Sequence, residues 1–151
     1  MKTDKPFQRK GGLSNSQVGR DFETKAQQFF AKRGLHLTTG VMVKIGINGR
    51  KLHKFDLGSR LEKVLVECKA HKWTEGGNVP SAKLTVWNEA MLFFHAAPRG
   101  YRKILFVLRD FSDKRKETLG EYYIRTNPHL IPKRVEVWEY NEKRRAAIKI
   151  K

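Results

Sequence analysis

The sequence predicts an α/β fold with a central mixed β-sheet flanked by helices. The stretch 64–69 begins apolar on both faces, and 104–108 is apolar throughout, so each is expected to be a strand covered on two sides. The segment between them carries the apolar spacing of a helix, which favours a parallel crossover between the two strands. At 151 residues the chain is long enough for one domain with a sizeable core.

A first helix is predicted from Ser14 or Ser16, either of which suits its N-terminal cap, to about Lys32. Gly34 is expected to end it, because glycine adopts the left-handed conformation that closes many helices. The apolar face of this helix repeats at helical spacing and is made of Val18, Phe22, Ala26, Phe29 and Phe30.

Three strands are expected to follow this helix. Residues 36–47 alternate weakly and read as a strand, the Asn-Gly pair at 48–49 is a strong hairpin signal, and a second strand runs from about 51 to 57. The Gly-Ser pair at 58–59 is then expected to turn the chain into the buried strand that ends near residue 70.

The second half begins with a helix for which Ser81 suits the cap and Gly100 marks the end. After strand 104–108 we expect a variable α/β tail with a short helix at about 118–125. A more exposed strand is predicted around 135–140, where apolar and charged residues alternate, and a last edge strand beyond it. The predicted order is therefore α-β-β-β-α-β followed by the tail.

The charge balance predicts a polyanionic partner. The chain has 32 basic and 15 acidic residues, a net charge of +17, which favours nucleic acid over an anionic membrane surface. Residues 1–13 are basic and are expected to form a flexible arm before a single domain at 14–151. No apolar run approaches the ~20 residues of a membrane span, and Cys68 is the only cysteine, so we expect a cytoplasmic, DNA-associated protein without a membrane partner.

Charged residues on the buried strand are the strongest sign of function. Glu67 and Lys69 share one face of that strand, and Asp56 on the preceding strand is expected to lie beside them. Charges are costly in such a place unless they are paired, hydrogen-bonded or bound to a metal. A purely structural ion-pair triad is the alternative.

These residues resemble the motif of the PD-(D/E)xK nucleases, the restriction-endonuclease-like superfamily. Asp56 matches the first acid and Glu67-Cys68-Lys69 matches the E-x-K element, although Phe55 stands where the nominal motif has proline. The first helix, in Gly19–Ala26, looks like the G-x-x-F-E-x-x-A helix of the Mrr-like and archaeal Holliday-junction-resolvase branches. The resemblance covers roughly residues 18–108.

The resemblance implies a DNA endonuclease that is structure-selective or weakly sequence-specific. Its Mg²⁺ or Mn²⁺ would be held by Asp56, Glu67, Glu23 and the backbone carbonyl of Cys68, and Lys69 would position the attacking water or balance charge. No organic cofactor is implied, and a homodimer is one arrangement that resolution of branched DNA would require. For Glu23 the alternative is a solvent-facing carboxylate paired within its helix.

Further basic and aromatic residues are candidate DNA contacts. This set contains Arg9, Lys10, Lys54, His71, Lys72, Trp73, Lys83, Arg144 and Arg145. Trp73 could stack on a base or equally cap the core, and the basic ends could simply be solvated. The alternative functions are a non-catalytic nucleic-acid-binding protein, or a nuclease subunit active only in a larger complex; RNA is the weaker substrate.

Overall fold

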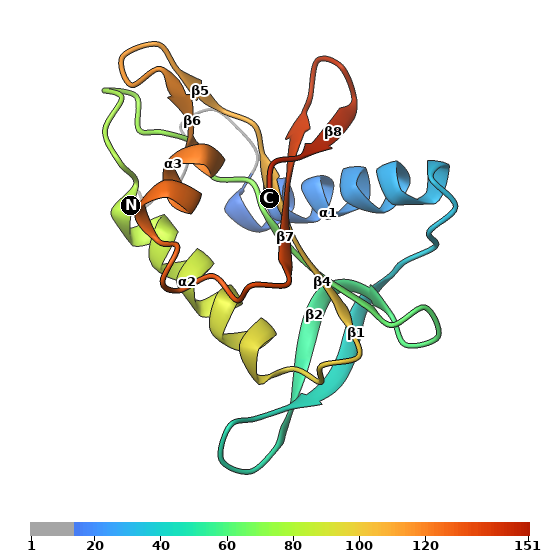
Figure 1. Ribbon diagram of the computed structural model, residues 1–151. Coiled ribbons are helices and arrows are strands. Elements are labelled where there is room, and N and C mark those ends of the chain that lie inside the picture. The colour runs from blue at the N-terminus through green and yellow to red at the C-terminus, as the bar shows by residue number, and fades with distance from the viewer. Residues whose placement is uncertain (1–13) are drawn as a thin grey trace, which may run out of the picture.

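A computed structural model describes residues 14–151 and contains one six-stranded mixed sheet (Figure 1). Its strands, in spatial order, are β1 (Thr38–Ile45), β2 (Lys51–Ser59), β3 (Val64–Lys69), β4 (Arg102–Leu108), β7 (Val135–Asn141) and β8 (Ala146–Lys149). The predicted α/β class with a mixed sheet flanked by helices is confirmed. The expected arm at 1–13, with Arg9 and Lys10, lies outside the described residues.

Parallel strands form the middle of the sheet. β3 pairs with β4, and β4 with β7, in parallel, whereas the pairs β1–β2, β2–β3 and β7–β8 are antiparallel. The crossover from β3 to β4 runs through α2 (Ser81–Ala96), as predicted. A small separate hairpin of β5 (Phe111–Ser112) and β6 (Glu117–Thr118) precedes α3 (Leu119–Thr126).

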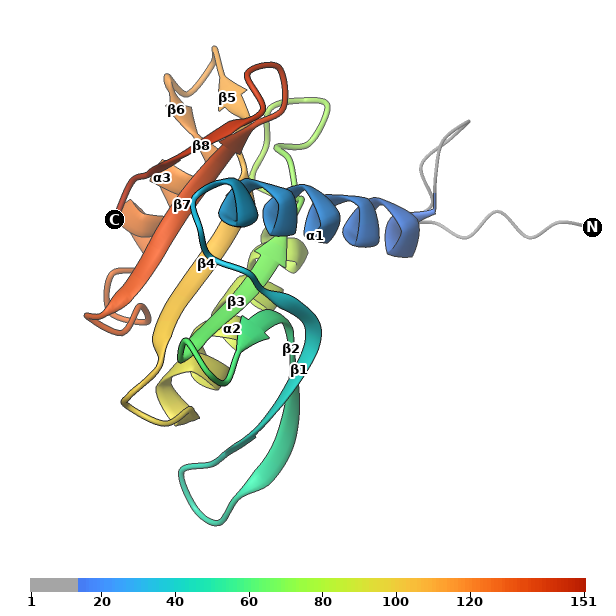
Figure 2. The same ribbon diagram turned by 90° about the vertical axis from the view of Figure 1, so that its right-hand side faces the viewer.

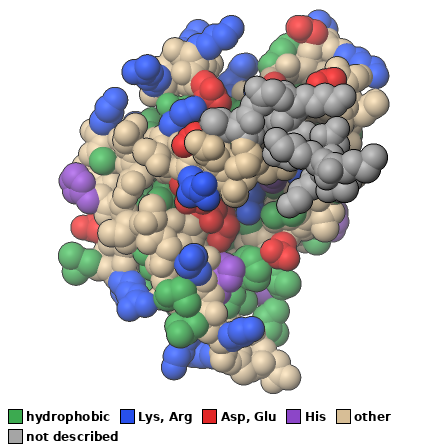
Figure 3. All heavy atoms as spheres, turned by 180° about the vertical axis from the view of Figure 1, so that it is seen from behind, with side chains coloured by type: hydrophobic (Ala, Val, Ile, Leu, Met, Phe, Trp, Pro, Cys, Tyr) green, Lys and Arg blue, Asp and Glu red, His purple; other side chains and the backbone are tan. Residues whose placement is uncertain are grey.

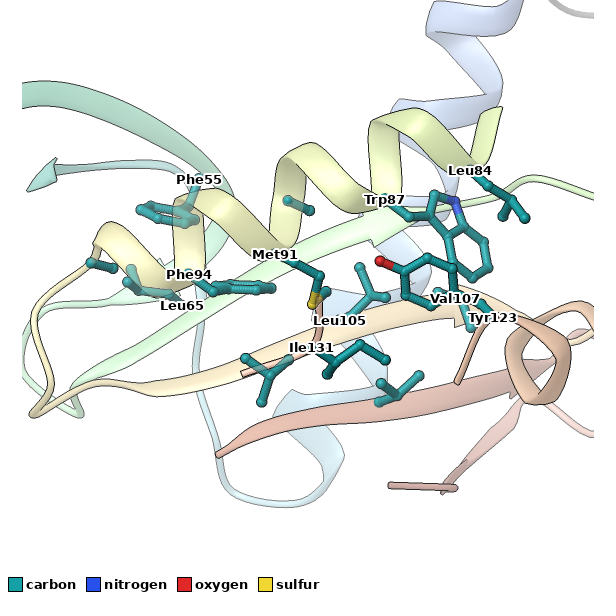
Figure 4. Packing of buried hydrophobic residues seen from close by; sticks show 14 of the residues in the cluster. Phe55, Leu65, Leu84, Trp87, Met91, Phe94, Leu105, Val107, Tyr123 and Ile131 are labelled. Atoms are coloured by element: carbon teal, nitrogen blue, oxygen red, sulfur yellow. The ribbon is translucent and has the colours of Figure 1, made fainter. Parts of the chain in front are cut away.

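Helices cover both faces of the sheet. On one face α1 (Asn15–Lys32) buries Phe22, Ala26 and Phe30, and the Phe22 ring lies 5.4 Å from that of Phe106 on β4. On the other face α2 and α3 cover the sheet, as Figure 4 shows for Trp87 and its neighbours above the strands. The apolar runs of β3 and β4 are therefore buried on two sides, as the sequence predicts.

The helix ends agree only partly with the predicted caps. Ser14 is the N-cap of α1, where its hydroxyl accepts a hydrogen bond from the Gln17 N–H, and Gly34 follows the helix with φ of 80°. The cap predicted at Ser81 is wrong. Pro80 occupies that position and makes no side-chain cap bond, because its ring carries no hydrogen-bond acceptor.

Gly58 lies inside β2, not in the predicted turn at 58–59. The turn falls at 60–63, where Lys63 has a positive φ of 57°. A Cβ at Gly58 would lie 2.6 Å from the Val64 carbonyl oxygen, so only glycine lets β3 come this close.

Strand β7 is buried, which corrects the exposed strand predicted around 135–140. It lies between β4 and β8, and Glu139 is only 2% exposed. Gly120 of α3 packs against the Glu139 carboxyl, and the end of the chain covers it through Ile150. The alternation of apolar and charged residues predicted that Glu139 faces solvent. In the structure Glu139 is buried, and this burial raises the pKa of its carboxyl.

Two glycine substitutions are predicted to change stability in opposite directions. Gly58→Ala should lower the free energy of unfolding by about 1–3 kcal/mol, because the added methyl meets a backbone oxygen. Gly19→Ala should raise it by about 0.5–1 kcal/mol, because a Cβ at this helical position meets nothing within 4 Å. Urea denaturation of both variants would measure the two changes; a neutral Gly58→Ala would contradict the close approach of β3.

Candidate active site at the split between β2 and β3

Strands β2 and β3 pair over only three residues and then separate. Their last pair is Leu57 with Val66, after which β2 continues beside β1 and β3 continues beside β4 (Figure 2). We call this place the split. Beyond it, the backbone N–H of Cys68 bonds instead to the Asp56 carboxylate, at 2.7 Å from N to Oδ2. The side chain of Asp56 thus replaces a strand partner.

Glu67 is the most buried charged group at the split, at 5% exposure. Its carboxyl is hydrogen-bonded to Asp56, and Lys69 Nζ lies 3.6 Å from Oε2. Burial, and then the charge of Asp56, raise the pKa of Glu67 to about 8, although Lys69 opposes them. Without a cation, this raised pKa favours the protonated form of Glu67 at neutral pH.

Glu23 brings a third acid to the same place from α1. Its side chain is partly buried, and its pKa is raised first by that burial and then by the charge of Asp56. Lys69 and Lys54 lower the pKa of Glu23, and Asp56 and Lys69 act on Glu23 and Glu67 alike. We call Glu23, Asp56, Glu67 and Lys69 the acid site, and the fold brings all four together as the sequence predicts.

The thiol of Cys68 packs in the apolar layer under α1. Burial, and then the nearby carboxylates, raise its pKa well above the ordinary value, so the sulfur is a packing group and a poor nucleophile. Its N–H fixes Asp56. The role of its carbonyl as a metal ligand stays a prediction.

His53 also contacts the acid site, although it is not among the site residues predicted from the sequence. Its ring packs against Phe93 of α2, with centroids 3.9 Å apart, and edge-on against Phe55. This packing holds Nε2 3.4 Å from Glu67 Oε1. The i, i+2 spacing of His53 and the core residue Phe55 is the available sequence signal, but only the fold places α2 beside them.

Among the expected DNA contacts, Trp73 instead caps the core, which is the alternative left open by the sequence. It is 8% exposed, its indole N–H donates to the Asp110 carbonyl at 3.0 Å, and Arg115 lies over its ring. Asp110 also accepts from the Trp73 backbone N–H. Asp110 was not singled out in the sequence, yet it fixes the loop after β3.

The other expected DNA contacts lie in different places. Lys54 is exposed on β2 close enough to Glu23 to lower its pKa, whereas Lys72 is exposed after β3. The His71 ring accepts a hydrogen bond from Trp87 Nε1 at 2.8 Å, which ties it to α2.

Lys83 is half-buried near the start of α2. Arg144 and Arg145 are exposed in the turn between β7 and β8, away from the split. Figure 3 shows acidic side chains gathered near the middle of one face, with Lys and Arg side chains around them.

The acid site fits a hard divalent cation by the chemistry of its donors. Among residues 14–151, no group of three or more His, Cys, Asp or Glu side chains is arranged to hold a metal ion. Mg²⁺, however, keeps several waters and often takes only one or two carboxylates. The charge of Asp56 helps to raise the pKa of Glu67, so a cation between these two side chains could take the place of the proton that Glu67 keeps.

Comparison of the chain with protein-family models, curated proteins and solved structures found no match. Functional assignment therefore depends on the acid site itself. None of the helices within 14–151 is long and apolar enough to cross a membrane.

The raised pKa of Glu67 predicts a pH-dependent stability. From the ordinary value of 4.5 up to about 8, the unfolded chain releases a proton that the folded chain keeps, so the free energy of unfolding should fall as pH rises. Glu67→Gln should flatten this fall and be more stable than wild type at pH 8 without metal. Thermal unfolding against pH would measure it.

Mn²⁺ provides the second half of this test. At pH 8 it should raise the Tm of wild type, because ionised Glu67 binds it, and should leave Glu67→Gln unchanged. Glu62→Gln, at an exposed carboxyl in the preceding turn, is the matched control and should behave like wild type. Equal pH dependence of Glu67→Gln and wild type would contradict the buried acid pair.

Proposed function

We propose that this chain is a metal-dependent DNA endonuclease of the restriction-endonuclease-like fold. The observation that carries the proposal is the acid site, with two interacting carboxyls and a lysine at the split of a mixed sheet, in a chain of net charge +17. The order α1-β1-β2-β3-α2-β4 around the site also fits that fold.

The contrast between the acid site and the rest of the chain supports a bound cation. A basic protein attracts phosphate, but Glu23, Asp56 and Glu67 would repel it where they lie. A divalent cation between the carboxylates and a phosphate removes this conflict. A protein that only binds DNA gains nothing from buried acids in its binding face.

Asp56 and Glu67 would hold the cation, with Glu23 as a further ligand or a base for its waters. When bound, Mg²⁺ or Mn²⁺ polarises the phosphoryl group and acidifies a water. Asp56 is positioned by the Cys68 N–H, and Glu67 by Lys69 and His53, so the ligands are oriented before the metal arrives.

Lys69 would act on the reacting groups. Hydrolysis joins the oxygen of water to phosphorus, breaks one P–O bond and leaves the proton of that water on the departing oxygen. The Lys69 ammonium lies 3.6 Å from Glu67, so it can hydrogen-bond the attacking water or the phosphoryl oxygens that gain negative charge. Each step needs only groups that the acid site brings together and the metal that it would bind.

The absence of a separate recognition domain within 14–151 supports structure-selective or weakly sequence-specific cutting. Resolution of branched DNA would need two such sites, and so a homodimer. Size measurement of the protein alone and on a four-way junction would distinguish this arrangement from a monomer acting on flaps or duplex.

Cleavage of labelled single-stranded, duplex, flapped and four-way DNA would test the proposal. With Mg²⁺ or Mn²⁺ we expect cutting that EDTA abolishes. Asp56→Asn and Lys69→Ala should each lower the rate by at least about 10²-fold, because they remove a metal ligand and a charge-stabilising donor. An equal length of RNA, included as a competitor, would report the preferred substrate.

Lys116→Ala is the charge-matched control for Lys69→Ala, since it removes one exposed lysine from the turn between β5 and β6. It should cut at close to the wild-type rate. Tight DNA binding without cutting, unaffected by Asp56→Asn, would overturn the stand-alone enzyme and leave a binding protein or a subunit of a larger nuclease.

A further inference from the structure

A hollow of about 400 Å³ lies between the second half of α1 and the turn that joins β7 to β8. Lys25, Phe29 and Lys32 line it from α1, at the spacing of one helix face, and Tyr140, Glu142 and Arg145 line it from the other side. We call it the α1 hollow. Its two walls are more than one hundred residues apart in the sequence, so the sequence alone does not join them.

The α1 hollow carries positive charge that the protein does not neutralise. Its three cations face one anion, Glu142, which lies 3.7 Å from Lys25 Nζ. Within residues 14–151, neither Lys32 nor Arg145 forms an ion pair. The hollow therefore has two unpaired cations, which favours an anionic ligand.

A second hollow beside α1 shows the contrast. It measures about 330 Å³ and contains Arg102 and Lys149, but both of these cations contact Glu136, at 2.6 and 3.4 Å. Arg33, at the same hollow, lies over the rings of Phe29 and Trp138. The charges there are already used within the fold, so the α1 hollow is the better anion site of the two.

We propose that the α1 hollow binds a backbone phosphate of DNA, beyond the phosphate that lies at the acid site. The choice of DNA rests on the proposed endonuclease function. Lys32 lies nine residues after Glu23 on α1, which is ~14 Å along the helix axis and about two and a half turns around it, so the two residues lie on opposite flanks of α1. The axial distance corresponds to about four base pairs of B-form DNA, so a duplex lying across α1 could reach both flanks.

The backbone at Arg145 provides a clean test. Asn141 Oδ1 accepts the N–H groups of Lys143 and Arg144, which shapes the turn, and Arg145 closes it with φ of 49°. Arg145→Gly removes the cation and suits this left-handed conformation. Lys116 has φ of 57° in the turn between β5 and β6, so Lys116→Gly removes the same charge and the same strain elsewhere (Figure 1).

The experiment measures binding of a labelled duplex in EDTA, between about 50 and 200 mM KCl. Arg145→Gly should reduce the magnitude of the negative slope of log affinity against log salt by about 1. The double variant that also carries Lys32→Ala should reduce it by about 2 in total. Lys116→Gly should keep the wild-type slope. Neither glycine variant should have a lowered Tm, so a change in the slope cannot be assigned to unfolding.

The outcomes separate this site from the proposed catalysis. One outcome is that wild type cuts no DNA while the salt dependence of DNA binding is reduced only in Arg145→Gly and in its combination with Lys32→Ala. In that case the proposed phosphate site stands and the proposed endonuclease does not. If wild type cuts but Arg145→Gly and Lys116→Gly bind alike, the endonuclease stands and the phosphate site is overturned. Inorganic phosphate is tested separately; an Arg145-dependent effect of phosphate with unchanged DNA binding would also overturn the proposal.

Discussion

The hydrogen bond from the Cys68 N–H to the Asp56 carboxylate, 2.7 Å long, joins β2 to β3 where their pairing ends. A buried backbone N–H left without a partner costs about 1–3 kcal/mol, so a side-chain acceptor is needed at this point. Asp56 supplies it and is thereby fixed beside Glu67. The separation of the strands therefore creates both the space for a functional site and the requirement that holds its first residue in place.

The number of acids around this bond argues against a simple structural ion pair. Lys69 would balance one carboxylate, yet Glu67, Asp56 and Glu23 all lie within its electrostatic reach. Burial removes one of these negative charges by keeping a proton on Glu67. Burying an acid in this way lowers the free energy of unfolding, so stability alone does not explain the arrangement. In the proposed function, a divalent cation would replace this proton between the carboxylates, and the net positive charge of the chain would attract a phosphate to that cation.

The sequence predicts the parts of the fold that depend on local pattern. The apolar runs of β3 and β4, the Asn-Gly turn at 48–49 and the spacing of Glu67 and Lys69 each carry their own signal. Prediction from the sequence fails where segments distant in the chain determine whether a side chain is buried. Glu139 looks exposed until α3 and the end of the chain cover it, and Trp73 looks available until Asp110 binds it. His53 gains its position only because Phe93 of α2 packs on its ring.

Helix α1 contributes side chains to both the acid site and the α1 hollow. One face supplies Glu23 to the acid site and Phe22, Ala26 and Phe30 to the core, while another supplies Lys25 and Lys32 to the α1 hollow. Because the core residues fix the rotation of the helix, they fix both functional faces at once. A change in core packing under α1 would therefore move the acid site and the α1 hollow together, whereas a change at Arg145 would alter the hollow alone. If both proposals hold, α1 would set the distance between the cut phosphate at the acid site and the phosphate bound in the α1 hollow.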